Sequence, residues 1–252
     1  MASFSLYWFA LALSTLGCTK DDTSGDSDTQ STGPEAVCTE PAEVECLDEL
    51  ILNLGLHDEV AEGLVSTSTD GDDFLTAVDG TAGGYSSAAQ NPWIYVRFGV
   101  DGAEKVEIDD EEALESMEWH MAFHRYKVRI NSGASGPSCV SVSPKIEGDY
   151  ASLSEVGEPT WYQDAFMTAS CEVTNESSGL PDSPQVAMSP WWSYESCVKT
   201  TGTPFLVQLD DGHVLKLVVE SYYLTGQEEC NSSGATTDRE SGNYVLRWQV
   251  LE

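Results

Sequence analysis

Five runs of aromatic and β-branched residues recur along the chain, and glycine, proline or Asp-Gly pairs separate them. Side chains of these types fit the half-buried surface of a pleated sheet, and the residues between the runs are those that tight turns require. The stretch from Asp210 to His213 stands between two of the runs and predicts a hairpin. We therefore expect a mainly β fold of antiparallel sheets. The five runs are residues 93–98, 119–130, 205–209, 214–223 and 244–250.

One segment before these runs has a helical period instead. Apolar residues recur at the spacing of one helix face, and Gly55 follows the last of them, where a helix commonly ends. The sequence therefore predicts one short amphipathic helix, within an N-terminal extension over residues 36–79. The apolar residues of this face are Leu47, Leu50, Ile51 and Leu54.

The N-terminus predicts export. Residues 6–13 form an uninterrupted apolar run, which is shorter than the roughly 20 residues that cross a bilayer. The run predicts a secretory signal peptide over residues 1–18. Residues 15–18, Thr-Leu-Gly-Cys, resemble the lipobox of bacterial lipoproteins. This resemblance implies a lipid on Cys18, membrane contact through that lipid alone, and a cell-envelope location as an outer-membrane lipoprotein facing the cell surface. The alternative is a plain secretory signal.

Acidic residues dominate the composition. The chain has 43 acidic and 11 basic residues, a net charge of −32, which would repel nucleic-acid phosphates and so excludes nucleic acid as a partner. Residues 19–35 contain no apolar side chain, and they predict a disordered acidic linker. Residues 109–112 (DDEE) are expected to be the solvated start of a short turn or helix.

Six cysteines follow Cys18, and none of them forms a Cys-x-x-Cys pair. An even, dispersed set predicts disulfides in an oxidising compartment rather than a zinc or redox site. Six cysteines allow fifteen pairings; proximity along the sequence favours Cys38 with Cys46 and Cys197 with Cys230, which leaves Cys139 with Cys171.

The sequence holds no motif for catalysis. We find no nucleophile elbow, zinc-protease helix, phosphate loop or dinucleotide fingerprint, and we expect no enzyme. His120 and His124 would lie on one face of a strand, but a metal site needs further ligands. We expect one of them to be packed or hydrogen-bonded and the other to lie at the surface.

Residues 119–136 (WHMAFHRYKVRINSGASG) carry the most specific pattern in the chain. They resemble the signature of the HmuY family of haem-binding bacterial lipoproteins, a Trp-x-Met/Ile-Ala-x-His-Arg-Tyr-x-Val-Arg-x-Asn strand that runs into a glycine-rich loop. Residues 205–223 and the last strand are similar to that family as well. The resemblance implies a single all-β domain over residues 80–252. The matching signature residues are Trp119, Met121, Ala122, His124, Arg125, Tyr126, Val128, Arg129, Asn131, Gly133 and Gly136.

The resemblance further implies a protein that binds haem or a related porphyrin and passes it to an outer-membrane haem transporter. In the family the axial ligands come from the segment after the signature loop, and not from the histidines of the signature strand. This chain has no histidine between His124 and His213, which leaves Met167 and Met188 as candidate ligands. Methionine also fills gaps in apolar cores. The alternative function is a surface interaction or structural module that has lost haem binding.

Overall fold

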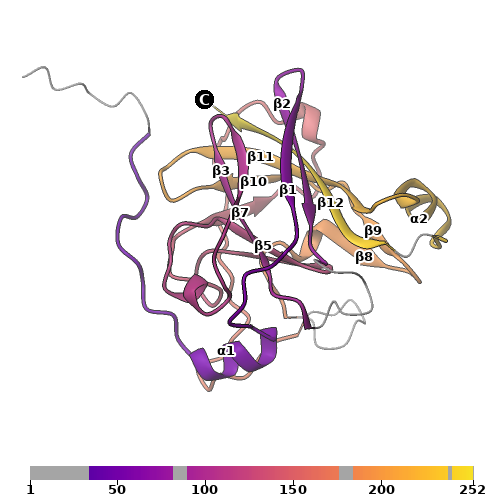
Figure 1. The fold of residues 1–252 in the computed structure, drawn as a ribbon. Coiled ribbons are helices and arrows are strands. Elements are labelled where there is room, and N and C mark those ends of the chain that lie inside the picture. Colours follow the sequence, from indigo (N-terminus) through magenta and orange to yellow (C-terminus); the bar gives the residue numbers. More distant parts are fainter. Residues whose placement is uncertain (1–33, 82–89, 176–183, 238–239, 252) are drawn as a thin grey trace, which may run out of the picture. The chain divides into compact units, whose positions relative to one another are not determined.

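The predicted runs form strands of antiparallel sheets (Figure 1), so the mainly β prediction is confirmed. The computed structural model describes residues 34–81, 90–175, 184–237 and 240–251. Cys18, the predicted signal peptide and nearly all of the predicted linker lie outside these ranges. The elements are α1 (Leu47–Leu54), β1 (Val65–Asp70), β2 (Asp73–Asp79), β3 (Ile94–Gly99), β4 (Gly102–Val106), η2 (Glu112–Leu114), β5 (Met121–His124), β6 (Lys127–Ile130), β7 (Ser141–Pro144), η3 (Tyr150–Ser152), η4 (Ser189–Trp191), β8 (Trp192–Tyr194), β9 (Val198–Thr200), β10 (Phe205–Gln208), β11 (Val214–Tyr223), α2 (Gln227–Ser233) and β12 (Ser241–Leu251).

The larger sheet has six strands in the order β1-β2-β12-β11-β10-β7. β10 and β11 pair antiparallel with Gln208 opposite Val214, which confirms the predicted hairpin. β11 and β12 are the long central pair, in register from Val214 with Leu251 to Tyr223 with Ser241, with two irregularities after Val219. A smaller sheet has the order β4-β3-β5-β6, and β8 and β9 form a separate hairpin.

The central strands of the smaller sheet, β3 and β5, are covered on both faces. In β3, Ile94, Val96 and Phe98 enter the apolar core that this sheet shares with the six-stranded sheet. Trp93 and Tyr95 face the other way, into a second apolar cluster that includes residues of α1. A strand with two covered faces needs no polar alternation, which explains the nearly continuous apolar run at residues 93–98.

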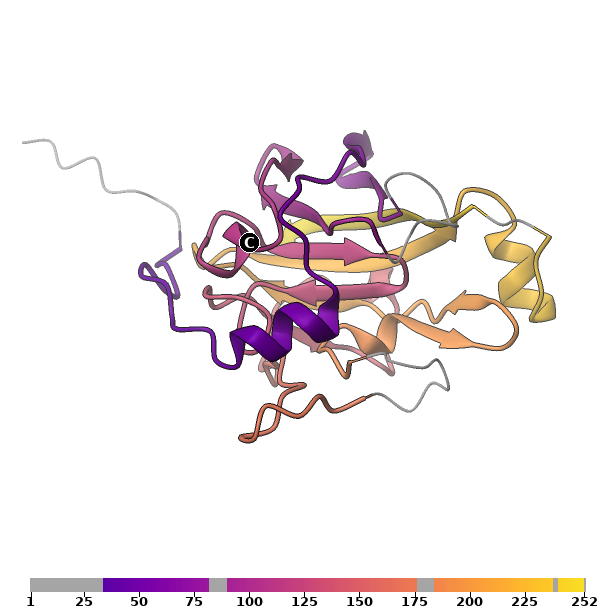
Figure 2. The ribbon, with the colours of Figure 1, turned by 60° about the horizontal axis from the view of Figure 1, so that its bottom comes forward.

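The predicted helix is confirmed as α1, which ends before Gly55. Gly55 adopts φ 60°, and its N–H donates to the carbonyl of Ile51. Leu50 and Leu54 are buried, because the helix lays one apolar face over the second cluster. Figure 2 shows α1 in front of the strands of the sheets.

All six described cysteines form disulfides, but two of the three predicted pairs are wrong. Cys197 pairs with Cys230 as predicted, whereas Cys38 pairs with Cys139 and Cys46 pairs with Cys171. Proximity along the chain fails here because the extension crosses the domain before α1 begins. The two long-range disulfides therefore lock the N-terminal extension to loops of the β domain.

Residues 34–44, which lead into α1, form a strap, and its first residues run against the β10–β11 turn. The N–H groups of Val37 and Cys38 donate to the carbonyl of Asp210 at 2.7 and 3.4 Å. Gly212 in this turn has φ 88°, and a Cβ atom there would lie 2.2 Å from the carbonyl oxygen of Glu35. The strap thus approaches the turn as closely as glycine allows.

Several strands and one α-helix lie outside the sequence prediction, namely β1, β2, β4, β7, β8, β9 and α2. The β1–β2 hairpin turns at Gly71 and Asp72, between strands whose register runs from Val65 with Val78 to Asp70 with Asp73. Its exposed Ser/Thr residues in β1 hide the strand from an apolar pattern. Among the described residues, no helix combines the length and the apolar character that crossing a membrane would take.

Candidate functional site

The signature stretch forms the hairpin β5–β6 and the loop after it, where the sequence predicts one long strand. Arg125 and Tyr126 make the two-residue turn, and Arg125 has φ 53°, a conformation that is costly for residues with a Cβ. The N–H of Arg125 donates to the carbonyl of Gly80 at 2.8 Å, and the carbonyl of Arg125 accepts from the Tyr244 hydroxyl. Contacts from distant segments therefore hold this turn in place, although it contains none of the residue types that usually form turns.

The predicted alternation of side chains holds within β5 but not before it. Met121 and Phe123 enter the core between the sheets, and Ala122 faces the second cluster. Trp119 joins the second cluster as well, although alternation predicts it on the side of Met121. The chain bends at His120 before β5 begins, and this bend turns Trp119 to the opposite face.

Arg129 in β6 is fully buried, and three aromatic rings surround its guanidinium group. The guanidinium carbon lies 4.7 Å from the Trp93 ring centre, 5.4 Å from that of Tyr95 and 5.2 Å from that of Trp119. Nη1 donates to the carbonyl of Ser135 at 3.1 Å, and Nη2 donates to the Tyr95 hydroxyl. A desolvated cation over aromatic faces gains about 2 kcal/mol. Trp119 and Arg129 of the signature thus form an internal support.

Asp110 supplies the opposite charge, and its burial corrects the expectation that the acidic run is solvated. Asp110 is fully buried. Its Oδ1 accepts from the Tyr95 hydroxyl and from the N–H of Trp93, both at 2.9 Å, and its Oδ2 accepts from the N–H of His57 at 3.0 Å. Burial raises the pKa of Asp110, while the charge of Arg129 lowers it. The pair is bridged through Tyr95.

The loop after β6 is closed by Asn131, and Gly136 makes room for it. The Asn131 amide donates to the carbonyls of Trp119 and Ser116 at 2.8 and 3.0 Å, and its oxygen accepts from the N–H of Ser138 at 3.1 Å. A Cβ atom at Gly136 would lie 2.3 Å from Oδ1 of Asn131 and 2.8 Å from the Trp119 ring. A side chain at this position would therefore break the loop closure.

The two signature histidines are both buried, so the expectation of one surface histidine is wrong. Nδ1 of His120 accepts from the N–H of Phe98, which leaves Nε2 to donate to Oδ1 of Asp210; both distances are 3.0 Å. Burial raises the pKa of Asp210, but the interactions with His120, the charge of Arg97 and the N–H of Asp211 together outweigh burial and hold the pKa below its ordinary value. His124 stacks on Trp93 with ring centres 5.2 Å apart. Both rings serve packing and positioning.

Asp164 ties the signature loop to the segment that carries the two candidate methionines. Its Oδ2 accepts from the N–H of Ile130 at 3.0 Å and from the hydroxyl of Ser135 at 2.5 Å, and its Oδ1 accepts from the N–H of Ala187 at 2.7 Å. Its carbonyl accepts from the N–H of Ala134 at 2.8 Å. Asp164 precedes Met167, and Ala187 precedes Met188. One carboxylate therefore fixes both ends of this segment to the signature loop.

Burial raises the pKa of Asp164 to about 6, although hydrogen bonds from Ser135, Ala187 and Ile130 lower it. Between pH 4 and pH 6 the folded state keeps a proton that the unfolded state releases, so stability falls as pH rises through this window, by about 3 kcal/mol from this group. We expect Asp164→Asn to remove this decrease of the free energy of unfolding between pH 4 and pH 6. Chemical unfolding of both proteins from pH 4 to pH 7 measures the difference between the two curves.

A second variant distinguishes the titration from a general effect of mutation at this place. Ser135→Ala keeps the carboxylate of Asp164 but removes one hydrogen bond to its ionised form, which raises the pKa of Asp164 further. The decrease in stability with pH should therefore extend to higher pH. Parallel curves for the parent and Asp164→Asn proteins would contradict the assignment of the slope to Asp164.

The structure places Met167 and Met188 in different apolar clusters. Met188 is 1 % exposed and belongs to the core between the sheets. Met167 is half-buried, forms an isolated β-bridge with Val173, and packs against the second cluster. The two side chains are not brought together, and the assignment of both as ligands stays a prediction.

Four aromatic side chains of the core between the sheets contact one another in a chain of rings, and together with Met188 of the same core we call them the Met188 cluster. The Trp191 ring lies 5.7 Å from the Tyr222 ring and 5.3 Å from the Tyr244 ring, between ring centres. Trp191 is 1 % exposed, and its Nε1 has no hydrogen-bond acceptor in the described part of the chain. A buried donor without an acceptor carries an unmet desolvation cost. The cluster comprises Met188, Trp191, Trp192, Tyr222 and Tyr244.

The donors at the Met188 cluster fit haem by their chemistry. Thioether sulfur is one of the side-chain ligands of haem iron, flat aromatic rings pack against a porphyrin plane, and the Trp191 Nε1 would donate to a carboxylate. The cluster is filled by its own side chains, because Met188 and Trp191 are each 1 % exposed. Binding at Met188 therefore requires these rings to move apart.

The sequence did not single out Tyr95, Asp110 or Asp164 as parts of this network. Asp110 lies in a run of four acids, where one buried carboxylate looks like its exposed neighbours. The pattern around Tyr95 indicates a strand residue and nothing more. Asp164 follows no periodic pattern, and only its position after the signature loop connects it with the site.

Comparison with known proteins finds one family model, described as HmuY protein, which matches residues 89–233, more than half of the chain. No curated protein matches. Among solved structures, a protein from Bacteroides vulgatus described as HmuY-like and haem-binding is 20 % identical, with a TM-score of 0.44, 73 % of this chain covered and 96 % of that one. A Bacteroides fragilis protein described as a lipoprotein is 16 % identical, with a TM-score of 0.39 and coverages of 76 % and 94 %. An apo HmuY analogue from Tannerella forsythia is 14 % identical, with a TM-score of 0.42 and coverages of 77 % and 100 %.

Proposed function

Because this chain belongs to the HmuY family, we propose that it is an exported, lipid-anchored protein that binds haem or a related porphyrin in haem acquisition. The observation that carries the proposal is the family match over residues 89–233, which includes the signature hairpin, Met167 and Met188. The lipid is attached at Cys18, and the protein faces the cell surface from the outer membrane. It passes its ligand to an outer-membrane haem transporter.

The proposal assigns the signature hairpin to support rather than to binding. The contacts of Arg129, Asn131 and Asp164 are directed inward, and both signature histidines are buried. Asp164 holds the segment from Met167 to Met188 at its two ends. The support therefore positions the segment from which the ligands come.

Met188 and Met167 would hold the haem iron through their thioether sulfurs. Haem would supply the iron and a flat apolar plate, and the chain would supply soft ligands and aromatic surface. Trp191, Tyr222 and Tyr244 would provide that aromatic surface, and the Trp191 Nε1 would be a donor for a porphyrin carboxylate.

We expect a saturable shift of the haemin Soret band when the purified protein is titrated at micromolar concentrations. In the Met167→Leu, Met188→Leu double variant the shift should be lost, or its midpoint raised at least about tenfold, because leucine keeps the core volume without a sulfur ligand. Met121→Leu is the matched control, since Met121 is a fully buried methionine of β5, and it should titrate like the parent protein.

A second function is favoured by two observations. The chain has no histidine between His124 and His213, and Met188 is packed like a core residue. In this alternative the protein is a surface interaction or structural module that has lost haem binding. No Soret shift at micromolar haemin supports it, whereas a shift that survives in the double variant retains haem binding and rejects the methionines as ligands.

A further inference from the structure

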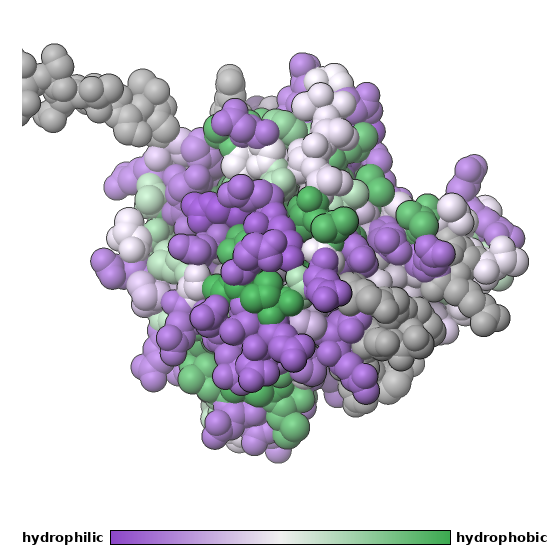
Figure 3. Space-filling model, in the orientation of Figure 1, coloured by the Kyte–Doolittle hydropathy of each residue, from purple (hydrophilic) through white to green (hydrophobic). Residues whose placement is uncertain are grey.

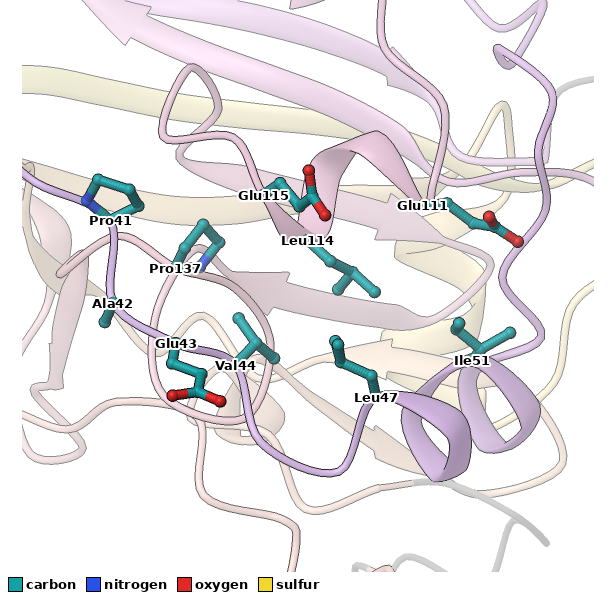
Figure 4. A pocket seen from close by; sticks show the side chains of 10 residues that line it. All are labelled: Pro41, Ala42, Glu43, Val44, Leu47, Ile51, Glu111, Leu114, Glu115 and Pro137. Carbon is teal, nitrogen blue, oxygen red and sulfur yellow. The ribbon is translucent and has the colours of Figure 1, made fainter.

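The N-terminal extension, the η2 segment and Pro137 in the loop after β6 line a groove of about 510 Å³ (Figure 4). One wall is the strap from Pro41 to Val44, and the other is η2 with its neighbours Glu111 and Glu115. α1 closes one end with Leu47 and Ile51. Six of the ten lining residues precede residue 89, where the family match begins, so this groove belongs largely to the extension of this chain.

The floor of the groove is apolar and incompletely covered. Val44, Leu114 and Pro137 are buried beneath it, whereas Leu47 is 46 % exposed. Leu47 and Ile51 are one helical turn apart on the side of α1 that faces the groove (Figure 4). Figure 3 shows apolar side chains on the lower part of the surface, where Figure 1 places α1. The exposed leucine offers area for a partner to cover.

Carboxylates stand on both sides of this floor. Glu43 lies on the strap wall, and Glu111 and Glu115 lie on the opposite wall; all three are exposed. The lining contains no lysine, arginine or histidine. A concave surface lined by one sign of charge attracts the opposite charge, so the groove selects against anions.

These features exclude the porphyrin of the proposed function as the occupant, because porphyrin carboxylates would meet three glutamates. We propose that the groove docks a segment of a partner protein in which an apolar side chain is flanked by lysine or arginine. The apolar side chain lies over Val44 and Leu114 between α1 and the strap. The flanking cations reach Glu43 on one wall and Glu111 and Glu115 on the other.

A short labelled peptide tests the proposal, with leucine at its centre, alanine on each side and lysine at each end. Fluorescence anisotropy at physiological ionic strength measures its affinity for the purified protein. We expect Glu111→Gln, Glu115→Gln to weaken binding about fivefold, because two exposed ion pairs are lost. Leu47→Ser should weaken it by a similar factor. Peptides with glutamate ends, or with alanine in place of the central leucine, should bind more weakly than the parent peptide.

Two control variants separate the groove from the general negative charge of the protein. Glu155→Gln, Glu158→Gln makes the same change of charge at exposed positions outside the groove, and Leu52→Ser removes a leucine that is 76 % exposed and does not line it. Both should bind the peptide like the parent. Equal losses in the Glu155, Glu158 variant, or unchanged binding in Leu47→Ser, would overturn the proposal. None of these variants touches the Met188 cluster, so haemin titration of the same proteins is independent of this result.

Discussion

Replacing Arg129 with methionine is expected to lower the free energy of unfolding by about 3–5 kcal/mol. Methionine fills much of the space between the Trp93, Tyr95 and Trp119 rings, but it leaves the buried carboxylate of Asp110 without its cation. Removing one member of a buried pair exposes the desolvation cost of the other. Urea unfolding at pH 7 measures the loss.

A double-mutant cycle separates the charge from the packing. Adding Asp110→Asn to Arg129→Met removes the stranded carboxylate, and we expect the double variant to recover part of the loss. Arg97→Met is the control, since Arg97 lies in β3 but its guanidinium donates to the carbonyl of Glu118 at the surface; its cost should stay within about 0.5 kcal/mol. A loss that the second substitution does not reduce would show that the rings, and not the carboxylate, require Arg129.

Removing the Cys46–Cys171 disulfide by a Cys46→Ala, Cys171→Ala double variant is expected to cost about 2–5 kcal/mol. This bond joins residues 125 apart in sequence, but the Cys38–Cys139 bond remains, so in the unfolded chain its loss opens only the loop made of residues 38–46 and 139–171. In the folded protein its loss unties α1 from the β domain. Thermal unfolding under oxidising conditions measures the shift in midpoint.

The Cys197–Cys230 disulfide, removed in a Cys197→Ala, Cys230→Ala variant, provides the comparison, because it closes a loop of 33 residues and does not involve α1. With Cys38–Cys139 intact the two loops are of similar length, so the two variants should lose similar amounts through the unfolded chain. The Cys46, Cys171 variant should lose more in total because it also releases α1, and equal or reversed losses would show that this tie does not add to stability. Binding of the labelled peptide in the groove should also be weaker in the Cys46, Cys171 variant, because α1 forms one end of the groove.

The strands and α1 follow from local patterns in the sequence, whereas the site depends on contacts between distant segments. The runs at residues 205–209 and 214–223 predict both strands and the turn between them. The turn at Arg125 is fixed by Gly80 and Tyr244, which lie far away in the chain. No local signal predicts a positive φ at an arginine, and the expectation of one long strand was wrong for this reason.

Charge shows the same division. The acidic composition predicts solvated carboxylates, and most carboxylates in the described ranges are exposed, but Asp110 and Asp164 are buried by the fold and paired with backbone N–H groups. The disulfide partners likewise depend on where the extension crosses the domain. Spacing in sequence carries no information about that path, so of the three predicted pairs only Cys197–Cys230 is confirmed.

The first part of the strap, residues 34–38, has a mechanical consequence. A pull on the chain ahead of residue 34 would first detach the two hydrogen bonds from Val37 and Cys38 to Asp210. The force would then pass through the Cys38–Cys139 bond into the chain just before β7, at the edge of the six-stranded sheet. With this disulfide formed, the pulling force would therefore act on the folded domain at Cys139 and would not pass through α1 or the groove beside it.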